Sequence, residues 1–107
     1  MPVEVNSENY EREVIQANKP VLVDFWGPQC RPCLALSPHI DRLAEAYRDK
    51  AKVTKLDASK NRRLCLSLKV IGLPTFLFYK DGREVGRLSG GDLKIADIEK
   101  TLKEVIE

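Results

Sequence analysis

The sequence predicts an α/β fold in which a mixed, mostly parallel central sheet carries helices on both faces. The chain has 107 residues, 43% of them apolar and 32% charged, which is typical of one globular domain. Segments with helical spacing alternate with short apolar runs, and this alternation favours strand–helix–strand units. Asp81-Gly82 lies between two such runs and is a strong hairpin signal, which adds an antiparallel pair. We expect a single domain over residues 1–107.

The first half of the chain begins with an expected helix and a buried strand. Tyr10, Val14 and Ala17 have helical spacing and predict a helix over about residues 7–18. The run from Val21 to Trp26 is apolar at nearly every position, as in a central strand that is covered on both faces. A long helix to about Arg48 follows, and its core face consists of Leu36, Ile40, Leu43 and Tyr47.

The second half continues the same alternation. It is expected to contain, in order, a strand over residues 53–57, a short helix begun by Ser59, a strand over residues 75–79 after Pro74, an antiparallel strand over residues 84–88 and a last helix over residues 93–106.

Charge and composition exclude several classes of function. The net charge of +2 is the small difference between 18 basic and 16 acidic residues, so no strong field favours nucleic acid or an anionic membrane. No apolar run approaches the ~18 residues of a membrane helix. The start, Met1-Pro2-Val3-Glu4, lacks the order of a signal peptide, and we expect a cytoplasmic protein. In a reducing compartment, closely spaced cysteines indicate metal binding or redox chemistry.

Cys30 and Cys33 stand three residues apart where a loop becomes a helix. Residues at this spacing face each other, close enough for a disulfide after small adjustments. The free N–H groups of a helix start also stabilise a thiolate, which is the reactive form. Asp24 stands within the apolar strand that precedes the pair, which predicts a buried acid; the alternative is an exposed carboxylate on an edge strand.

A zinc site is the alternative to a redox pair, with Cys65 and His39 as the two further ligands. A zinc ribbon normally brings a second close cysteine pair, which this chain lacks, and Pro32 between the ligands would stiffen the loop. We therefore interpret Cys65 as a packing residue and His39 as a solvated helix residue.

Taken together, these features resemble the thioredoxin family over essentially the whole chain. The matching residues are Asp24-Phe25-Trp26, Cys30-x-Pro32-Cys33, Pro38, Lys55-x-Asp57, Gly72-Leu73-Pro74-Thr75 and Asp81-Gly82. The resemblance implies a thioredoxin fold with a central mixed five-stranded sheet flanked by four helices. It also implies a thiol–disulfide oxidoreductase, a protein-disulfide reductase and electron carrier without cofactor or metal, that cycles between the Cys30–Cys33 dithiol and disulfide.

The resemblance also implies roles for single residues. Cys30 would be the nucleophile and Cys33 the resolving thiol, with Asp24 relaying protons beside a buried Lys55. The Leu73–Pro74 bond would be cis, although the sequence alone favours trans. The expected substrate-contacting residues are Trp26, Gln29, Arg31, Pro32, Leu73, Pro74, Gly90 and Gly91, the last two as alternatives for one family glycine.

The chain departs from the family around its cysteines. The family usually has Trp before the first cysteine, Gly after it and a basic residue after the second, where this chain has Gln29, Arg31 and Leu34. Arg31 predicts a less negative reduction potential through thiolate stabilisation, unless it points into water and affects only partner choice. The variant motif is similar to that of thioredoxins from anaerobic bacteria, some of which donate electrons to glycine reductase systems.

The implied partners are disulfide-containing proteins and a thioredoxin reductase, linked to NADPH or ferredoxin, and the implied state is a monomer. The sequence is also compatible with three other functions. They are a specialist electron donor to one reductase system, a thioredoxin-fold binding module with an incidental dithiol, and a glutathione-dependent glutaredoxin.

Overall fold

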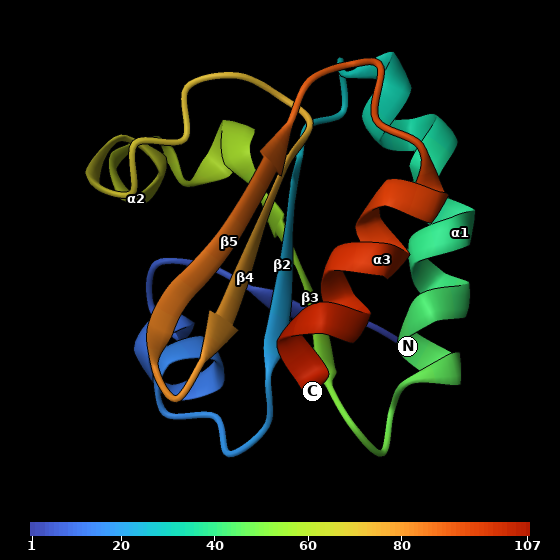
Figure 1. Cartoon of the computed structure of the whole chain (residues 1–107). Coiled ribbons are helices and arrows are strands. Elements are labelled where there is room, and N and C mark those ends of the chain that lie inside the picture. Colours follow the sequence, from blue (N-terminus) through green and yellow to red (C-terminus); the bar gives the residue numbers. More distant parts are fainter.

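The computed structural model describes residues 1–107, and its five strands form one mixed sheet in the order β1-β3-β2-β4-β5 (Figure 1). The strands are β1 (Val3–Val5), β2 (Val21–Trp26), β3 (Lys52–Asp57), β4 (Thr75–Lys80) and β5 (Arg83–Ser89). β1, β3 and β2 are parallel, whereas β4 is antiparallel to both β2 and β5. The predicted mixed sheet with one antiparallel hairpin is confirmed.

Helices cover both faces of this sheet. α1 (Arg31–Ala46) and α3 (Ile95–Ile106) lie on one face, and the π-helical segment η1 (Glu11–Ile15) and α2 (Arg62–Ser67) lie on the other (Figure 1). A single 3-10 turn, η2 (Ala58–Lys60), precedes α2. The implied arrangement of five strands and four flanking helices is therefore confirmed. None of these helices combines the length and the apolar composition that crossing a membrane requires.

β2 lies at the centre of the sheet, and its alternating side chains divide the core into two clusters. Val23 and Phe25 pack toward η1 and α2, whereas Leu22 packs toward α1 and α3. Asp24 shares the face of Leu22, and its register partners are Lys55 on β3 and Phe76 on β4. The central position of β2 thus places a carboxyl group under α1.

The helix expected over residues 7–18 is wrong in length and type, because regular structure covers only Glu11–Ile15. The carboxamide oxygen of Asn6 accepts hydrogen bonds from the backbone N–H of Glu8 (2.8 Å) and Asn9 (3.1 Å), so a turn replaces the expected first helical turn. Gln16 N–H then donates to Glu11 at 2.9 Å, five residues back, which closes the segment as a π-helix.

Two helix starts also differ from those predicted. α2 begins at Arg62 and not at Ser59, which lies in η2 and donates hydrogen bonds from its backbone N–H and its hydroxyl to the Asp57 carboxylate. α3 begins at Ile95 instead of residue 93, because Asp97 accepts from the Lys94 N–H in a capping box. The local caps, rather than the apolar spacing, decide where these helices start.

The Asp81-Gly82 hairpin is confirmed and depends on backbone geometry. Asp81 and Gly82 have φ angles of 54° and 78°, the positive values that a two-residue turn of this hand requires. A Cβ at Gly82 would also lie 2.9 Å from the carbonyl oxygen of Ile15, so η1 packs against the hairpin where only glycine fits.

Candidate active site

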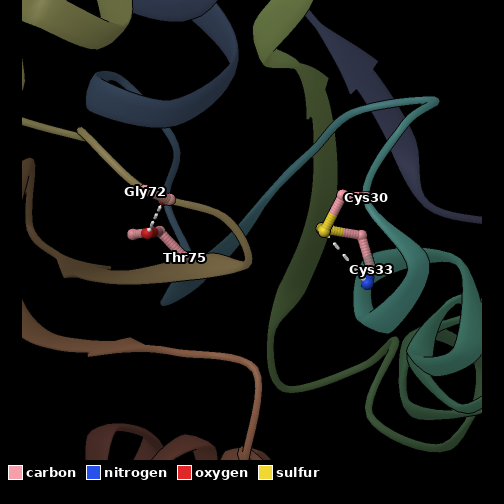
Figure 2. Close-up of a disulfide and its surroundings, with 4 residues drawn as sticks. All are labelled: Cys30, Cys33, Gly72 and Thr75. Atoms are coloured by element: carbon pink, nitrogen blue, oxygen red, sulfur yellow. Dashed lines mark hydrogen bonds between the residues drawn. A yellow bond between two sulfur atoms is a disulfide. The ribbon is translucent and has the colours of Figure 1, made fainter.

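The two cysteines lie at the carboxyl end of β2, where the chain turns into α1. The loop after Trp26 is closed by a 3.0 Å hydrogen bond from Cys30 N–H to the Gly27 carbonyl. Cys30 is the N-cap of α1, and its Sγ accepts from Cys33 N–H at 3.2 Å (Figure 2). Figure 2 also shows the Cys30–Cys33 disulfide, whose Cα atoms are 5.2 Å apart. The structure therefore shows the oxidised form of the chain. The Cys30 sulfur already accepts a hydrogen bond from a backbone N–H of the helix.

The two sulfurs face different surroundings. Cys30 is half-buried and lines a surface groove, whereas Cys33 is only 2% exposed and lines an inner cavity. After reduction, Cys30 is the sulfur that a foreign disulfide can reach. The helix N-terminus and the Cys33 N–H favour its thiolate.

The surface groove beside Cys30 has a volume of about 590 Å³. One wall is the loop that carries Pro28 and Gln29, and the opposite wall comes from α2 and the segment after it. Leu66 and Ile71, 72% and 92% exposed, lie on that second wall, an unusual exposure for large apolar side chains. The Cys30 sulfur thus opens onto an apolar surface.

A second loop carries two predicted substrate-contacting residues, Leu73 and Pro74. The Leu73–Pro74 peptide bond is cis, as the resemblance implied, and the preceding Gly72 carbonyl accepts from Thr75 Oγ1 at 2.6 Å (Figure 2). Gly90 N–H donates to the Pro74 carbonyl at 3.1 Å, which ties the loop after β5 to this turn.

The position after Gly90 reaches the first turn of α1 between the two cysteines, because a Cβ at Gly91 would lie 3.8 Å from Pro32. Both glycines thus lie at the site, and they differ in the backbone conformation that they must adopt. Gly90 has a φ of 118° and Gly91 has no positive φ.

Asp24 is buried beneath the dithiol, with an exposed fraction of 2%. Its position on the central strand β2 excludes the alternative of an exposed edge carboxylate. No hydrogen bond reaches its Oδ1 atom. Burial raises the pKa of Asp24 to about 7 from its ordinary 3.8; the Lys55 charge opposes this rise and the Asp41 charge adds to it. Asp24 can therefore gain or lose a proton near neutral pH.

An inner cavity of about 170 Å³ connects Asp24 with the sulfur of Cys33. Its lining residues are Asp24, Trp26, Cys33, Leu34, Ser37 and Lys55. Trp26 Nε1 is buried without a partner, like Asp24 Oδ1. Polar groups around a space of this size can hold water, which carries protons between groups that do not touch. Trp26 therefore lines the space behind the dithiol.

Lys55 lines this cavity together with Asp24, but its ammonium pairs with side chains on α1. Its Nζ donates to Ser37 Oγ at 2.6 Å and forms an ion pair with Asp41 Oδ1 at 2.8 Å. The Lys55 side chain is 19% exposed, so it is mostly rather than fully buried. Sequence reasoning missed both helix partners. The signal that could have found them is the spacing of Cys33, Ser37 and Asp41 by four residues, which puts all three on one face of a helix.

The other site predictions divide into three outcomes. Cys65 is buried in the core cluster below α2, which confirms a packing role, and burial raises the pKa of its thiol. His39 lies on α1 with its Nδ1 atom 3.2 Å from Arg42 Nη2, so neither residue joins Cys30 and Cys33 in a zinc-like cluster. Arg31 is exposed at the start of α1, and its expected influence on the thiolate stays a prediction.

Comparison with known proteins decides the family. The Thioredoxin family profile matches residues 1–104. The chain belongs to the thioredoxin family. It is 42% identical over 103 residues to a thioredoxin of Acetoanaerobium sticklandii, covering 96% of this chain and 98% of that protein. It is 39% identical over 90 residues to a thioredoxin of Peptoclostridium acidaminophilum, covering 84% and 82%.

A third relative joins two activities in one chain. The bifunctional thioredoxin reductase/thioredoxin of Mycobacterium leprae is 34% identical over 94 residues, which cover 88% of this chain and 20% of that protein. With the joined Cys30–Cys33 pair at the start of α1, membership in the thioredoxin family makes this chain a thiol–disulfide oxidoreductase with disulfide reductase activity.

Proposed function

We propose that the chain, as one thioredoxin domain over residues 1–107, reduces protein disulfides with Cys30 as the nucleophile and Cys33 as the resolving thiol. The observation that carries this assignment is the contrast between the two sulfurs. Cys30 caps α1 and opens onto the groove, whereas Cys33 lies 2% exposed behind it. Gln29, Arg31, Pro32, Leu73, Pro74 and the two glycines, Gly90 and Gly91, would contact the substrate from the loops around Cys30, and Trp26 would support them from within.

The proposed reaction has two exchange steps. The Cys30 thiolate attacks one sulfur of the partner disulfide, a mixed disulfide forms, and the other partner sulfur leaves as a thiolate. The Cys33 thiolate then attacks Cys30 Sγ, which releases the second partner sulfur and closes the Cys30–Cys33 disulfide. The partner gains two electrons, and its two thiolates take up protons.

Asp24 is the proposed acceptor of the Cys33 proton before the second step. A buried thiol is a poor nucleophile until it ionises, and Asp24 and Cys33 line the same cavity. A base works best when its pKa lies near the operating pH, which holds for a pKa of about 7. Asp24 would return the proton when the disulfide is reduced again.

The partners follow from the same cycle. A thioredoxin reductase is the proposed electron source, supported by the relative that carries both activities in one chain. Its own electrons would come from NADPH or ferredoxin. We propose that the protein works as a monomer in the cytoplasm, because Cys30 must stay accessible and the disulfide must be reduced after each turnover.

The residues around the cysteines that differ from the usual family pattern favour a second candidate function, in which the protein has a narrow range of partners. Gln29 is an exposed residue on the groove wall where the family usually has an aromatic side chain, and loss of such an anchor weakens generic protein contacts. The protein would then be a specialist electron donor to one reductase system. Trapping mixed disulfides from cell extract with Cys33→Ser distinguishes the two, since a specialist captures one dominant partner.

Insulin reduction tests the central assignment. We expect the parent and Cys65→Ala to reduce insulin, and Cys30→Ser to lose more than ~99% of the rate, because it lacks the attacking thiolate. Full activity in Cys30→Ser, or an inactive parent, would leave a binding module with an incidental dithiol. Activity that requires glutathione would instead support a glutaredoxin.

A further inference from the structure

The position of the Lys55 ammonium is the unexpected feature beneath the dithiol. Lys55 and Asp24 are register partners on β3 and β2, and both point to the α1 face. No ion pair within 4.0 Å joins them; the Lys55 ammonium is bonded to Ser37 and Asp41 on α1 instead. Two carboxylates therefore compete for one cation, and the more exposed Asp41 holds it.

This arrangement follows from electrostatics and burial. The Asp41 side chain is 49% exposed, so it keeps its charge with the help of water while it pairs with Lys55. Asp24 lies further inside, where ionisation costs more. A flexible lysine therefore gains more from the hydrated partner than from the buried one.

We propose that Asp41 is a positioning residue that holds Lys55 away from Asp24, and so keeps the buried carboxyl group easier to protonate than an Asp24–Lys55 pair would be. Ser37 assists by accepting the second hydrogen bond of the same ammonium. The inference deepens the proposed function, because it rests on Asp24 as the proton acceptor of Cys33.

The charged groups around Asp24 are few, so the effect of each can be isolated. β3 contributes Lys55, which lowers the pKa of Asp24, and α1 contributes Asp41, which raises it. The β4 neighbour is Phe76, which carries no charge. On α3, Glu99 is occupied by a 2.7 Å hydrogen bond from Tyr47 Oη.

Removal of Asp41 should therefore act on Asp24 in two ways with the same sign. It removes one negative charge, and it releases Lys55 to approach Asp24. Both changes favour the ionised carboxylate, so Asp41→Asn lowers the pKa of Asp24. Removing one charge near a cavity corresponds to roughly 0.5–1 pH unit at the effective dielectric constants found in proteins.

The test is a titration of the Asp24 carboxyl carbon by NMR in the oxidised protein, where Cys33 does not titrate. We expect Asp41→Asn to move the midpoint to lower pH by roughly 0.5–1 unit. Glu45→Gln is the matched control, because it removes a carboxylate charge from the same helix at an exposed position paired only with Arg48. It should leave the midpoint unchanged. An unchanged or higher midpoint in Asp41→Asn would overturn the proposal.

A double-mutant cycle separates positioning from simple charge repulsion. If Asp41 acts through Lys55, the shift caused by Asp41→Asn should fall below half its size in a Lys55→Met background. An equal shift in both backgrounds would also overturn the proposal. Lys55→Gln serves the same purpose if the methionine variant does not fold.

The kinetic readout keeps this proposal distinct from the role of Asp24. The rate at which Cys33 resolves a mixed disulfide can be measured by stopped flow as a function of pH. In Asp41→Asn, the acid limb of this rate profile should shift to lower pH by the same amount as the NMR midpoint. If Asp24→Asn leaves that rate unchanged at every pH, the proton-relay role fails. The Asp24 titration midpoints, measured with and without Lys55, still decide the positioning proposal.

Discussion

Replacement of Asp24 by asparagine should stabilise the oxidised protein at neutral pH. Asp24 is 2% exposed and accepts no hydrogen bond at Oδ1, so its ionised form is unfavourable in the folded state. The folded pKa of about 7 lies above the ordinary 3.8, which the unfolded chain retains. Below pH 3.8 both states hold the proton, and above pH 7 both have lost it. The folded state therefore becomes less stable as the pH rises from about 4 to about 7.

The magnitude follows from the size of the pKa shift. A shift from 3.8 to about 7 is a little over 3 pH units, and one unit corresponds to about 1.4 kcal/mol, so ionisation of Asp24 costs about 4 kcal/mol above neutral pH. An asparagine side chain cannot ionise, so the advantage of Asp24→Asn over the parent should grow by about 4 kcal/mol between pH 4 and pH 8. Any constant cost of the buried amide cancels in this pH dependence.

The assay is guanidinium unfolding followed by far-UV circular dichroism, with the disulfide kept intact, at several pH values from 4 to 8. Parent and variant are compared at each pH, so the contributions of other titrating groups to the free energy of unfolding cancel in the difference. For Glu45→Gln, which removes an exposed carboxylate, the difference from the parent in free energy of unfolding should not change with pH. A flat difference for Asp24→Asn as well would refute the reasoning, because it would mean that burial does not raise the pKa of Asp24.

Three further predictions follow from the described geometry. Arg31→Gly should have a more negative reduction potential than the parent in a glutathione redox buffer, because a cation beside Cys30 is lost; an equal or less negative value would contradict a role in thiolate stabilisation. Gly82→Ala should lower the free energy of unfolding by about 1–3 kcal/mol, since it forces a side chain onto a φ of 78° and against a backbone carbonyl. Gly72→Ala is its control, because no atom lies within 4 Å of the new Cβ, and a similar loss in both would argue against a steric cause. Cys65 should react far more slowly with a thiol reagent in the folded protein than in guanidinium, as expected of a buried thiol of raised pKa, and equal rates would contradict its burial.

The sequence by itself determined the features that depend on short stretches of chain. The continuous apolar run over β2 required a central strand, and with it a buried Asp24, because an amphipathic edge strand would alternate. Cys30 and Cys33 meet because three residues span less than one helical turn. The hairpin at Asp81-Gly82 follows from two residues that tolerate positive φ.

Local hydrogen bonds limited even these predictions at the element ends. Asn6 and Asp57 accept hydrogen bonds from backbone N–H groups, and the turns they form displace the helix starts that the apolar spacing suggests. The three-residue strand β1 has too few side chains for a recognisable period, and it exists because it pairs with β3, about fifty residues away along the chain.

Only the tertiary structure decided which side chains share the space beneath the dithiol. Lys55 could have paired with Asp24, its register partner on the adjacent strand. Instead, packing of α1 on the sheet brings Asp41 and Ser37 within bonding distance of the ammonium. The same packing places Gly91 against Pro32. The apolar groove beside Cys30 likewise depends on tertiary structure, because the loop before Cys30 and α2 line it together. Spacing along one element fixes local neighbours, whereas the partner of a long, flexible cation depends on the distances between elements and on how much water each charge retains.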